Sequence, residues 1–420
     1  MFSFFRNKFL FITDYDVNIG NFSEKLLHAL YKAKRENKQV VFVRKRLFFK
    51  FLFDKLRYKQ LTGLYRLESK YIYKNKFLDM TLGILFGFIF SSQVAYKSIL
   101  YILRINRPFS YDYLGVGCKD LMNTENEKVF NKNPSKNIDW STLFEEKLDI
   151  DLSKKDIDLS KQNLLSLGVK DDDWFVCLHI RTTYFGNESE KATFRNSTPE
   201  NYIKAIKYIN DLGGKVIRLG DPIDMSIKNI CIDYPNSIYK SELMDLFLIK
   251  NCRFYIGTNS GILDTAFLFG TPVLGVNYSD FGLAKAYKSY DKILFIKVKN
   301  KSIGQILTLE KVFSNKMYIN TNINDIYLNS FFEKYQLVEN SEEDIFIAVE
   351  EMIENLVNPK QKDDLDIKFD ELVYNTISRW IDEEKDFFSK NWTQTELAYR
   401  YSNRTKANGR TCKFQLIRGY

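Results

Sequence analysis

The stretch RFYIGTNSGILDTAFLFGTPVLGVN, residues Arg253–Asn277, alternates strand, glycine-rich turn, helix and strand within a short span. We expect a buried strand at Arg253–Gly257, a helix at Ser260–Phe269 and a second buried strand at Pro272–Asn277. Two strands joined by one helix lie parallel in a sheet. The stretch therefore predicts an α/β fold, and it raises the question of why two glycines stand in one turn.

The segments before this stretch repeat the same alternation. Pro199 opens a predicted helix at its favoured first position, and Gly213-Gly214 ends that helix. The remaining elements are strands at Trp174–Ile180, Lys215–Leu219 and Ile230–Tyr234, and a helix at Ser241–Lys250 with Ser241 as its N-cap. Strands that are apolar throughout predict a parallel, doubly wound sheet with both faces covered.

The N-terminal part of the chain contains a second unit of the same kind. Lys8–Thr13 and Gln39–Val43 have the composition of strands, and an amphipathic helix at Asn21–Asn37 separates them. A chain of 420 residues is also too long for one ordinary core. We therefore expect two Rossmann-like, doubly wound α/β domains that face a cleft. The predicted ranges are 1–162, 163–340 and a helical region 341–420 that packs back on the N-terminal domain.

Charge is distributed unevenly along the chain. Residues 1–110 hold 21 Lys and Arg against 7 Asp and Glu, net +14, whereas the remaining residues are net −5. In Arg44–Lys76 the basic residues alternate with Phe, Leu and Tyr. This pattern favours an anionic membrane surface over nucleic acid, because bases do not need a wide apolar face. A solvated basic helix that packs its apolar side on the core is the structural alternative.

The most apolar run is Leu82–Leu103, which Ser-Ser-Gln and Lys97 interrupt. A membrane-spanning helix needs about 20 apolar residues, so a buried or interfacial helix is favoured here. Whether this run enters the membrane stays open.

Metal and disulfide chemistry have little support. The five cysteines form no C-x-x-C pair, and the chain has two histidines, which favours reduced thiols and no histidine metal site. Asp171-Asp172-Asp173 precedes its strand, so it lies on the sheet edge opposite the ligand crevice. We interpret it as a solvated turn and expect neither a metal nor another cofactor.

Polar side chains gather where the strand Trp174–Ile180 ends. His179 and Arg181 are alternate residues, so they point to the same side. An arginine at a strand end can bind a phosphate or carboxylate in a bidentate manner, and Arg195 lies further along the same long loop. The structural alternative is a hydrogen-bonded core histidine and a salt-bridged arginine.

The glycine-rich turn lies at a neighbouring strand end. Its residues are Gly257, Thr258, Asn259, Ser260 and Gly261. Its serine can cap the following helix, and its glycines allow a ligand to approach the backbone closely. The positive end of a helix suits a diphosphate. A simple capped turn is the structural alternative, and the pattern is neither a dinucleotide fingerprint nor a Walker loop.

A third strand end carries Arg218, Gly220 and Asp221. In a parallel sheet it lies on the same edge as the other two, so these residues are candidates to line a sugar or base pocket. A plain turn accounts for them equally well.

The segments FVCLHIR, RNSTPENYIKAIKYINDLGGKVIRLGDP and DLFLIKNCRFYIGTNSGILDTAFLFGTPVLGVN together resemble a family of bacterial glycosyltransferases encoded with surface-polysaccharide genes. The resemblance covers residues 174–278 well and the flanks weakly. It implies a GT-B fold, with a nucleotide-sugar donor bound by the C-terminal domain and the acceptor towards the N-terminal domain.

Two motifs carry residues over from related enzymes. The His-x-Arg element is similar to the strand-end arginine of O-fucosyltransferase-like enzymes, which implies a donor contact for Arg181 and a weaker one for His179. The GTNSG element resembles the D-[ST]-G-x-x-H loop of heptosyltransferases, which implies donor contacts at Asn259, Ser260 and Gly261. Asp264 departs from that loop, which has histidine there, and this weakens a heptose-donor assignment.

The resemblance implies a metal-independent transfer. Arg181 and the helix N-terminus would stabilise the leaving diphosphate, and a carboxylate in the first strand–helix loop would deprotonate the acceptor. Asp16 is the preferred base, with Asp14 as the other candidate, and an in-line displacement would invert the anomeric centre. The expected partners are a nucleotide-sugar, a saccharide or lipid-linked acceptor and an anionic membrane, without nucleic acid. The expected location is cytoplasmic, on the inner face of the cytoplasmic membrane.

Two other functions stay open at the level of sequence. One is a basic, non-enzymatic protein that binds anionic lipid or nucleic acid through Lys45, Arg46 and Lys50. The other is a nucleotide-sugar epimerase on the same fold, which would form product without an acceptor.

Overall fold

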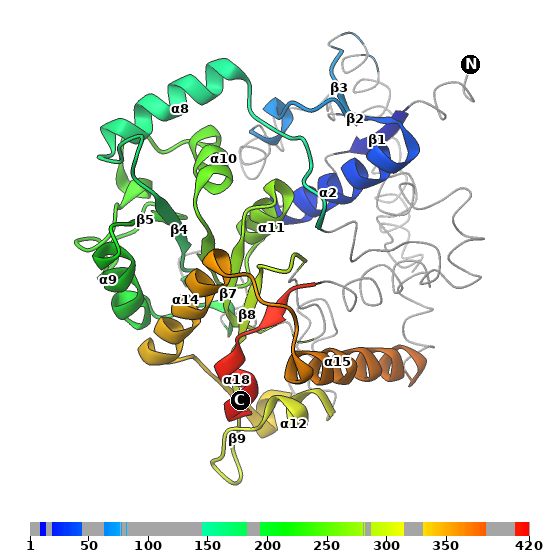
Figure 1. Ribbon diagram of the computed structural model, residues 1–420, viewed down its shortest axis with the longest axis vertical. Coiled ribbons are helices and arrows are strands. Elements are labelled where there is room, and N and C mark those ends of the chain that lie inside the picture. The colour runs from blue at the N-terminus through cyan, green and yellow to red at the C-terminus, as the bar shows by residue number, and fades with distance from the viewer. Residues whose placement is uncertain are drawn as a thin grey trace, which may run out of the picture.

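The computed structural model describes residues 9–13, 19–43, 63–75, 77, 81, 145–182, 194–279, 281, 287–314, 331–383 and 408–419. Six strands of the described chain form one parallel sheet (Figure 1). They are β4 (Phe175–His179), β5 (Lys215–Leu219), β6 (Tyr255–Gly257), β7 (Val273–Tyr278), β8 (Lys292–Phe295) and β11 (Arg410–Thr411). Their spatial order is β11-β8-β7-β6-β4-β5. The predicted α/β class with a parallel sheet is confirmed.

The expected strand at Ile230–Tyr234 is wrong, because only Ile232 pairs there, through a parallel bridge to Ile217 of β5. Pro235 lies in a 3-10 turn, η7 (Tyr234–Asn236), and proline has no N–H to extend a ladder. The bridge still places this segment on the outer edge of β5. With it, the order becomes that of a Rossmann sheet, in which the direction of strand addition changes between β4 and β6.

The helices of this unit follow the predicted alternation. They are α8 (Lys154–Ser166), η6 (Pro199–Tyr202), α9 (Ile203–Asp211), α10 (Glu242–Asn251) and α11 (Gly261–Phe269). The Ser241 hydroxyl accepts a hydrogen bond from Met244 N and so caps α10, as predicted. Gly270 ends α11 at φ +68°, a left-handed conformation that glycine adopts without strain.

The N-terminal unit is a smaller parallel sheet in the order β1-β2-β3. Its elements are β1 (Phe9–Thr13), α2 (Ile19–Glu36), β2 (Gln39–Val43), η2 (Leu64–Arg66) and β3 (Ile72–Tyr73). The predicted strand–helix–strand unit is therefore confirmed within a residue or two at each end. The chain thus contains two parallel α/β units.

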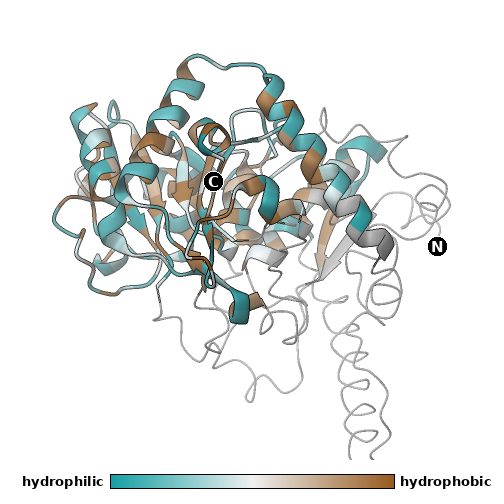
Figure 2. Cartoon of the chain, turned by 90° about the horizontal axis from the view of Figure 1, so that it is seen from below, coloured by the Kyte–Doolittle hydropathy of each residue, from teal (hydrophilic) through white to brown (hydrophobic). Residues whose placement is uncertain are grey.

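The two units share one continuous core. Phe22, Leu26 and Leu30 of α2 belong to the same buried cluster as Leu263 and Phe267 of α11. The two helices pack directly on one another and lie side by side in Figure 1. Figure 2 shows apolar residues concentrated in the interior and polar residues on the outer helices. Burial of the apolar faces of α2 and α11 therefore holds the units together.

The described part of the C-terminal region combines helices with a short strand. Its elements are α14 (Glu342–Val357), α15 (Asp364–Glu383), β11 and α18 (Lys413–Arg418). The described part packs on the 163–340 region, because α14 contacts α9, β7 and β8, and β11 extends the large sheet beside β8. α15 lies against α12 (Leu309–Ser314), and β9 (Lys297–Asn300) pairs antiparallel with β10 (Tyr335–Val338). The described residues of this region therefore add to the second unit, and residues 384–407 lie outside the described part of the chain. The predicted boundary at residue 162 falls inside α8.

The predicted membrane-facing segments cannot be compared with the structure. Residues 44–62 and Leu82–Leu103 lie outside the described residues. In the described ranges, no helix combines the length and apolarity needed to cross a membrane.

Candidate functional site

The candidate site lies where β4 and β6 end side by side. His179 is the last residue of β4 and pairs with Gly257, the last residue of β6. In doubly wound sheets, ligands bind at the carboxyl edge where the strand order reverses, because the chains leave the two strands in opposite directions. In this sheet that position lies between β4 and β6. This place, where the strand order reverses, is the switch point. The predicted His-x-Arg motif and the glycine-rich turn Gly257–Gly261, called the glycine loop below, therefore lie on its two sides.

A side-chain contact joins the two motifs. The Ser260 Oγ lies 3.2 Å from His179 Nδ1, within hydrogen-bond distance. Ser260 occupies the N-cap position of α11, but its side chain makes no capping bond. The predicted serine cap is therefore wrong. The hydroxyl is directed at β4, so no side chain of the cap residue occupies the first turn of α11.

Arg181 follows His179 and is mostly buried. Its side chain is held by Asn196, because Nη1 donates to Asn196 Oδ1 at 2.8 Å. Its carbonyl accepts from Ser197 N at 2.9 Å. Burial, with repulsion from Arg195, lowers the pKa of the Arg181 guanidinium to about 10. The group stays protonated at neutral pH and supplies a partly desolvated positive charge, which strengthens its attraction for an anion.

The segment that follows the loop is anchored by a buried polar network. The Ser197 hydroxyl accepts from Asn277 Nδ2 at 2.8 Å and donates to Glu339 Oε2 at 3.0 Å. Asn277, the penultimate residue of β7, has φ +50°, and its Oδ1 accepts from Asn340 N and Nδ2, both at 2.8 Å. These bonds fix Ser197, and with it the backbone beside Arg181, to β7 and to the connection between β10 and α14. Such a network restricts the conformations of the arginine.

His179 is neutral in this environment. Burial, together with the positive charges of Lys240, Arg181 and Arg218, lowers the pKa of its imidazole to about 3. Gly220, at φ +110°, lies against the ring, since a Cβ there would meet His179 Cδ2 at 3.2 Å. A neutral histidine surrounded by cations is a poor general base. The Ser260–His179 contact therefore does not form a nucleophile–base pair, and it orders the junction of the two loops.

Replacing His179 by glutamine is expected to change how stability depends on pH. In the folded protein His179 has a pKa near 3, against 6.5 for an ordinary histidine, so the unfolded chain takes up a proton between these values that the folded chain does not. The stability that His179 contributes is complete above pH 6.5 and is lost as pH falls. We expect the wild type to lose up to about 1.4 kcal/mol more per pH unit than His179→Gln between pH 6 and 4. Urea unfolding over this range measures the difference.

Asp291 titrates in the opposite sense but does not obscure this comparison. Burial raises the pKa of its carboxyl to about 7, so its contribution is lost as pH rises from near 4 towards 7. That contribution is present in both proteins and cancels in their difference. Parallel stability curves for the two proteins would show that His179 takes up its proton in the folded state.

Arg218 bonds to groups of the protein itself, unlike a residue that would contact a ligand. Its guanidinium is fully buried and donates to Asp233 Oδ1 at 2.6 Å and to the carbonyls of Asp221 and Ile223 at 3.0 Å. These bonds clamp the turn that carries Gly220 and Asp221. The structure gives Arg218 a positioning role, because the turn that it holds presses Gly220 against His179. The Asp221 side chain lies partly exposed beside it.

The two glycines of the glycine loop meet protein and not open space. A Cβ on Gly257 would lie 2.7 Å from the ring of Tyr255. A Cβ on Gly261 would lie 3.0 Å from Gly20 N of the N-terminal unit. Both positions of this turn therefore need glycine for packing, and Gly261 allows α11 to touch α2.

The other loop residues lie in two environments. Asn259 is partly exposed. Thr258 is fully buried, and its Oγ1 has no hydrogen-bond partner. A buried hydroxyl without a partner costs about 1–3 kcal/mol, so this atom marks a position where the edge of the sheet is incompletely satisfied.

The predicted base cannot be placed. Asp14 and Asp16 lie in 14–18, outside the described residues, but that segment leads into Ile19, whose side chain lies 3.7 Å from the Cβ position of Gly261. Ile19, the first described residue after that segment, therefore lies beside the glycine loop. Among the described residues, no group of three or more His, Cys, Asp or Glu side chains is arranged to hold a metal ion. Asp171 and Asp172 are exposed in a turn, as predicted.

Sequence reasoning missed Lys240 and Asp245. The Lys240 ammonium lies 2.6 Å from both carboxylate oxygens of Asp245, and its charge contributes to the low pKa of His179. Lys240 precedes α10, at the end of a segment that adds to the same edge of the sheet. A lysine directly before a serine-capped helix was the available signal, but its proximity to β4 depends on the order of the strands.

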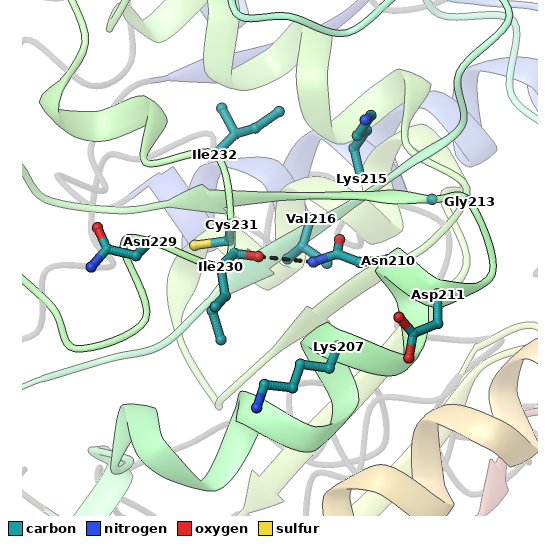
Figure 3. A pocket seen from close by; sticks show the side chains of 11 residues that line it. Lys207, Asn210, Asp211, Gly213, Lys215, Val216, Asn229, Ile230, Cys231 and Ile232 are labelled. Carbon is teal, nitrogen blue, oxygen red and sulfur yellow. Dashed lines mark hydrogen bonds between the residues drawn. The ribbon is translucent and has the colours of Figure 1, made fainter.

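A separate hollow lies at the opposite edge of the sheet. It has a volume of about 540 Å³ and is formed by the end of α9, the start of β5 and residues 229–232. Figure 3 shows Asn210 across it, where Nδ2 donates to the Ile230 carbonyl at 2.9 Å. Lys207, Lys215 and Asp211 are among the side chains that line it. The hollow adjoins the amino end of β5, so it is remote from the switch point.

Comparison with known proteins gives structural likenesses alone. No protein-family model and no curated protein matches the chain. A glycosyl transferase of family 9 from Veillonella parvula is 11% identical, with 82% of this chain and 97% of that chain covered and a TM-score of 0.40. The E. coli ADP-heptose LPS heptosyltransferase II is 12% identical over 64% of this chain and 84% of its own, at a TM-score of 0.34. The dodecameric iron-containing heptosyltransferase TibC, solved with ADP-D-β-D-heptose, is 10% identical over 83% and 77%, at a TM-score of 0.34. Likenesses this low carry neither substrate nor mechanism to this chain.

Proposed function

We propose that the chain is a glycosyltransferase. It moves a sugar from a nucleotide-sugar donor to a saccharide or lipid-linked saccharide in the synthesis of surface polysaccharide or lipopolysaccharide. The observation that supports this most is the junction at the switch point. There the Ser260–His179 contact holds the N-terminus of α11 beside the β4 end that carries Arg181. A protonated guanidinium and a helix N-terminus together suit a diphosphate.

In this proposal the protein supplies the charge stabilisation. As the bond between sugar and diphosphate breaks, negative charge grows on the leaving phosphate, and Arg181 with the first turn of α11 stabilises it. His179 stays neutral and orients Ser260. Asn259 and Asp221 are partly exposed at the same edge and are available to the sugar or base. Because the cationic groups already present fit the diphosphate, we propose that transfer needs no metal.

The acceptor side of the proposal rests on the N-terminal unit. Asp16 is the proposed base, with inversion at the anomeric carbon as the expected outcome. The basic and apolar segment in Arg44–Lys76 is proposed to bind the inner face of the cytoplasmic membrane, where a lipid-linked acceptor would be reached. The proposed base and the proposed membrane contact both rest on the sequence pattern.

Ligand-observed NMR with the full chain tests the donor assignment. ADP, UDP, GDP and CDP are added separately, and we expect saturation transfer to at least one of them, unchanged by EDTA. AMP serves as the matched probe, and we expect weaker binding because it carries one phosphate group. No binding of any diphosphate to folded protein would overturn the proposal, and loss of binding in EDTA would overturn its metal-independent part.

A second assay separates transfer from the alternatives. Incubation of the bound nucleotide's sugar conjugates without acceptor is expected to leave the sugar configuration unchanged. Formation of an epimer would identify an epimerase. Binding to anionic vesicles or nucleic acid in the absence of any nucleotide binding would instead favour the non-enzymatic alternative.

A further inference from the structure

Asp264 lies where the two α/β units meet. The N-termini of α2 and α11 converge, because a Cβ on Gly20 would lie 2.4 Å from Gly261 Cα. Each helix N-terminus carries about half a positive charge, so two that meet in a mostly buried place repel one another. A junction of this kind needs a nearby negative charge.

Asp264 is placed to supply that charge. It lies in the first turn of α11 and is 8% exposed. Its Oδ2 is 2.7 Å from the Cβ position of Gly20, so the carboxylate is in contact with the first turn of α2. α2 has no acidic residue in its own first turn. One carboxylate therefore adjoins both helix ends.

The contact has a consequence for the start of α2. Ile19, the first residue of α2, lies against Gly261. Whatever fixes the first turn of α2 against α11 also fixes Ile19 and Gly20 relative to the glycine loop. One turn further along, Ser23 Oγ lies 3.1 Å from Thr265 Oγ1 in a buried contact, so the same interface offers a neutral control.

We infer that Asp264 is a positioning residue. Its carboxylate balances the converging N-termini of α2 and α11, and so couples the first turn of α2 to the glycine loop at the switch point. This inference rests on the proposed function only where a bound diphosphate is concerned.

Hydrogen exchange on the full-length protein tests the inference. In Asp264→Asn, which keeps the shape and removes the charge, we expect amides of residues 19–23 to exchange about tenfold faster than in the wild type. Asp264→Ala is a second variant with the same expected direction. In the control Ser23→Ala, the charge balance is intact, so slow exchange at Ile19 and Gly20 is expected to persist.

The coupling between the first turn of α2 and the glycine loop is measured with the diphosphate that binds most tightly among ADP, UDP, GDP and CDP. Binding is expected to protect residues 19–23 further in the wild type and in Ser23→Ala, but not in Asp264→Asn. The affinity of Asp264→Asn is expected to stay within threefold of the wild type or to increase, because a nearby negative charge has been removed. If Asp264 had a purely structural role, its replacement would not abolish the ligand-induced protection while the affinity stays intact.

The outcomes separate the two claims. Unchanged exchange in both Asp264 variants overturns the inference, as does loss of ligand protection in Ser23→Ala to the same extent. An affinity loss above tenfold in Asp264→Asn also overturns it, because Asp264 would then act on the ligand itself. If no diphosphate binds the wild type, the proposed function fails, and the exchange rates without ligand alone decide the role of Asp264.

Discussion

Replacing Arg181 by alanine is expected to weaken binding of nucleoside diphosphate by about 100-fold, since a hydrogen-bonded charge pair contributes about 1.5–3 kcal/mol. The guanidinium is mostly buried, is held by Asn196, and stays protonated at neutral pH. Its attraction for an anion is therefore little screened by solvent. Arg181→Lys keeps the charge but loses the planar fork, so an intermediate affinity is expected. Titration calorimetry with the diphosphate found by NMR gives the values.

Arg253→Ala is the matched control for this prediction. Arg253 lies over the ring of Trp174, 4.6 Å from its centroid, just before β6 and therefore at the opposite edge of the sheet. Its loss changes the net charge equally, so an affinity within twofold of the wild type is expected. Near-normal binding by folded Arg181→Ala would remove the central residue of the proposed donor site.

Gly20→Ala is expected to destabilise the protein by about 3 kcal/mol, the upper end for overpacking a close contact. The new methyl group would lie 2.4 Å from Gly261 Cα and 2.9 Å from Gly261 O, and backbone atoms cannot rotate away. Within a helix, alanine is otherwise more favourable than glycine by about 1 kcal/mol, so the predicted sign opposes helix propensity. Urea unfolding and thermal melting measure the change.

Gly63→Ala is the control for steric contact. Gly63 has φ −62° and ψ −44°, which alanine adopts without strain. Its added methyl group would meet the Leu246 Cδ1 at 3.0 Å, the end of a side chain that can shift. A small effect is expected there. If Gly20→Ala were as stable as Gly63→Ala, the close approach of α2 and α11 would not contribute to stability as described.

The candidate site was partly predictable from sequence. His179 ends a recognisable apolar strand, and Arg181 and Ser260 each follow one. Parallel strands bring their carboxyl ends to one edge of the sheet. Their partners were not predictable. Ser260 reads as a helix cap, but in the structure it contacts His179, which is 81 positions away. Arg218 reads as a pocket residue, but Asp233 and the carbonyls of its own turn take up its guanidinium.

Glycine was the most ambiguous signal. At Gly257 and Gly261 the sequence indicates only that the backbone is closely approached or needs freedom to turn. A bound phosphate, a tyrosine ring and a neighbouring helix all satisfy that condition. The structure brings Tyr255 against Gly257 and Gly20 against Gly261. The prediction of a strand at Ile230–Tyr234 was wrong because composition alone was ambiguous there too. The composition fits a strand, but Pro235 and the turn at its end allow only one bridge.

Local patterns of residues were enough to predict most helices and strands and the edge of the sheet on which each strand-end residue lies. Apolar runs, caps and turn residues act over a few positions, and parallel pairing follows from their alternation with helices. Only the tertiary structure decided what each polar side chain meets and that α2 packs on α11. Contacts such as Ser23 with Thr265 join residues 242 positions apart. Such contacts depend on the close packing of whole helices, which no local pattern of residues specifies.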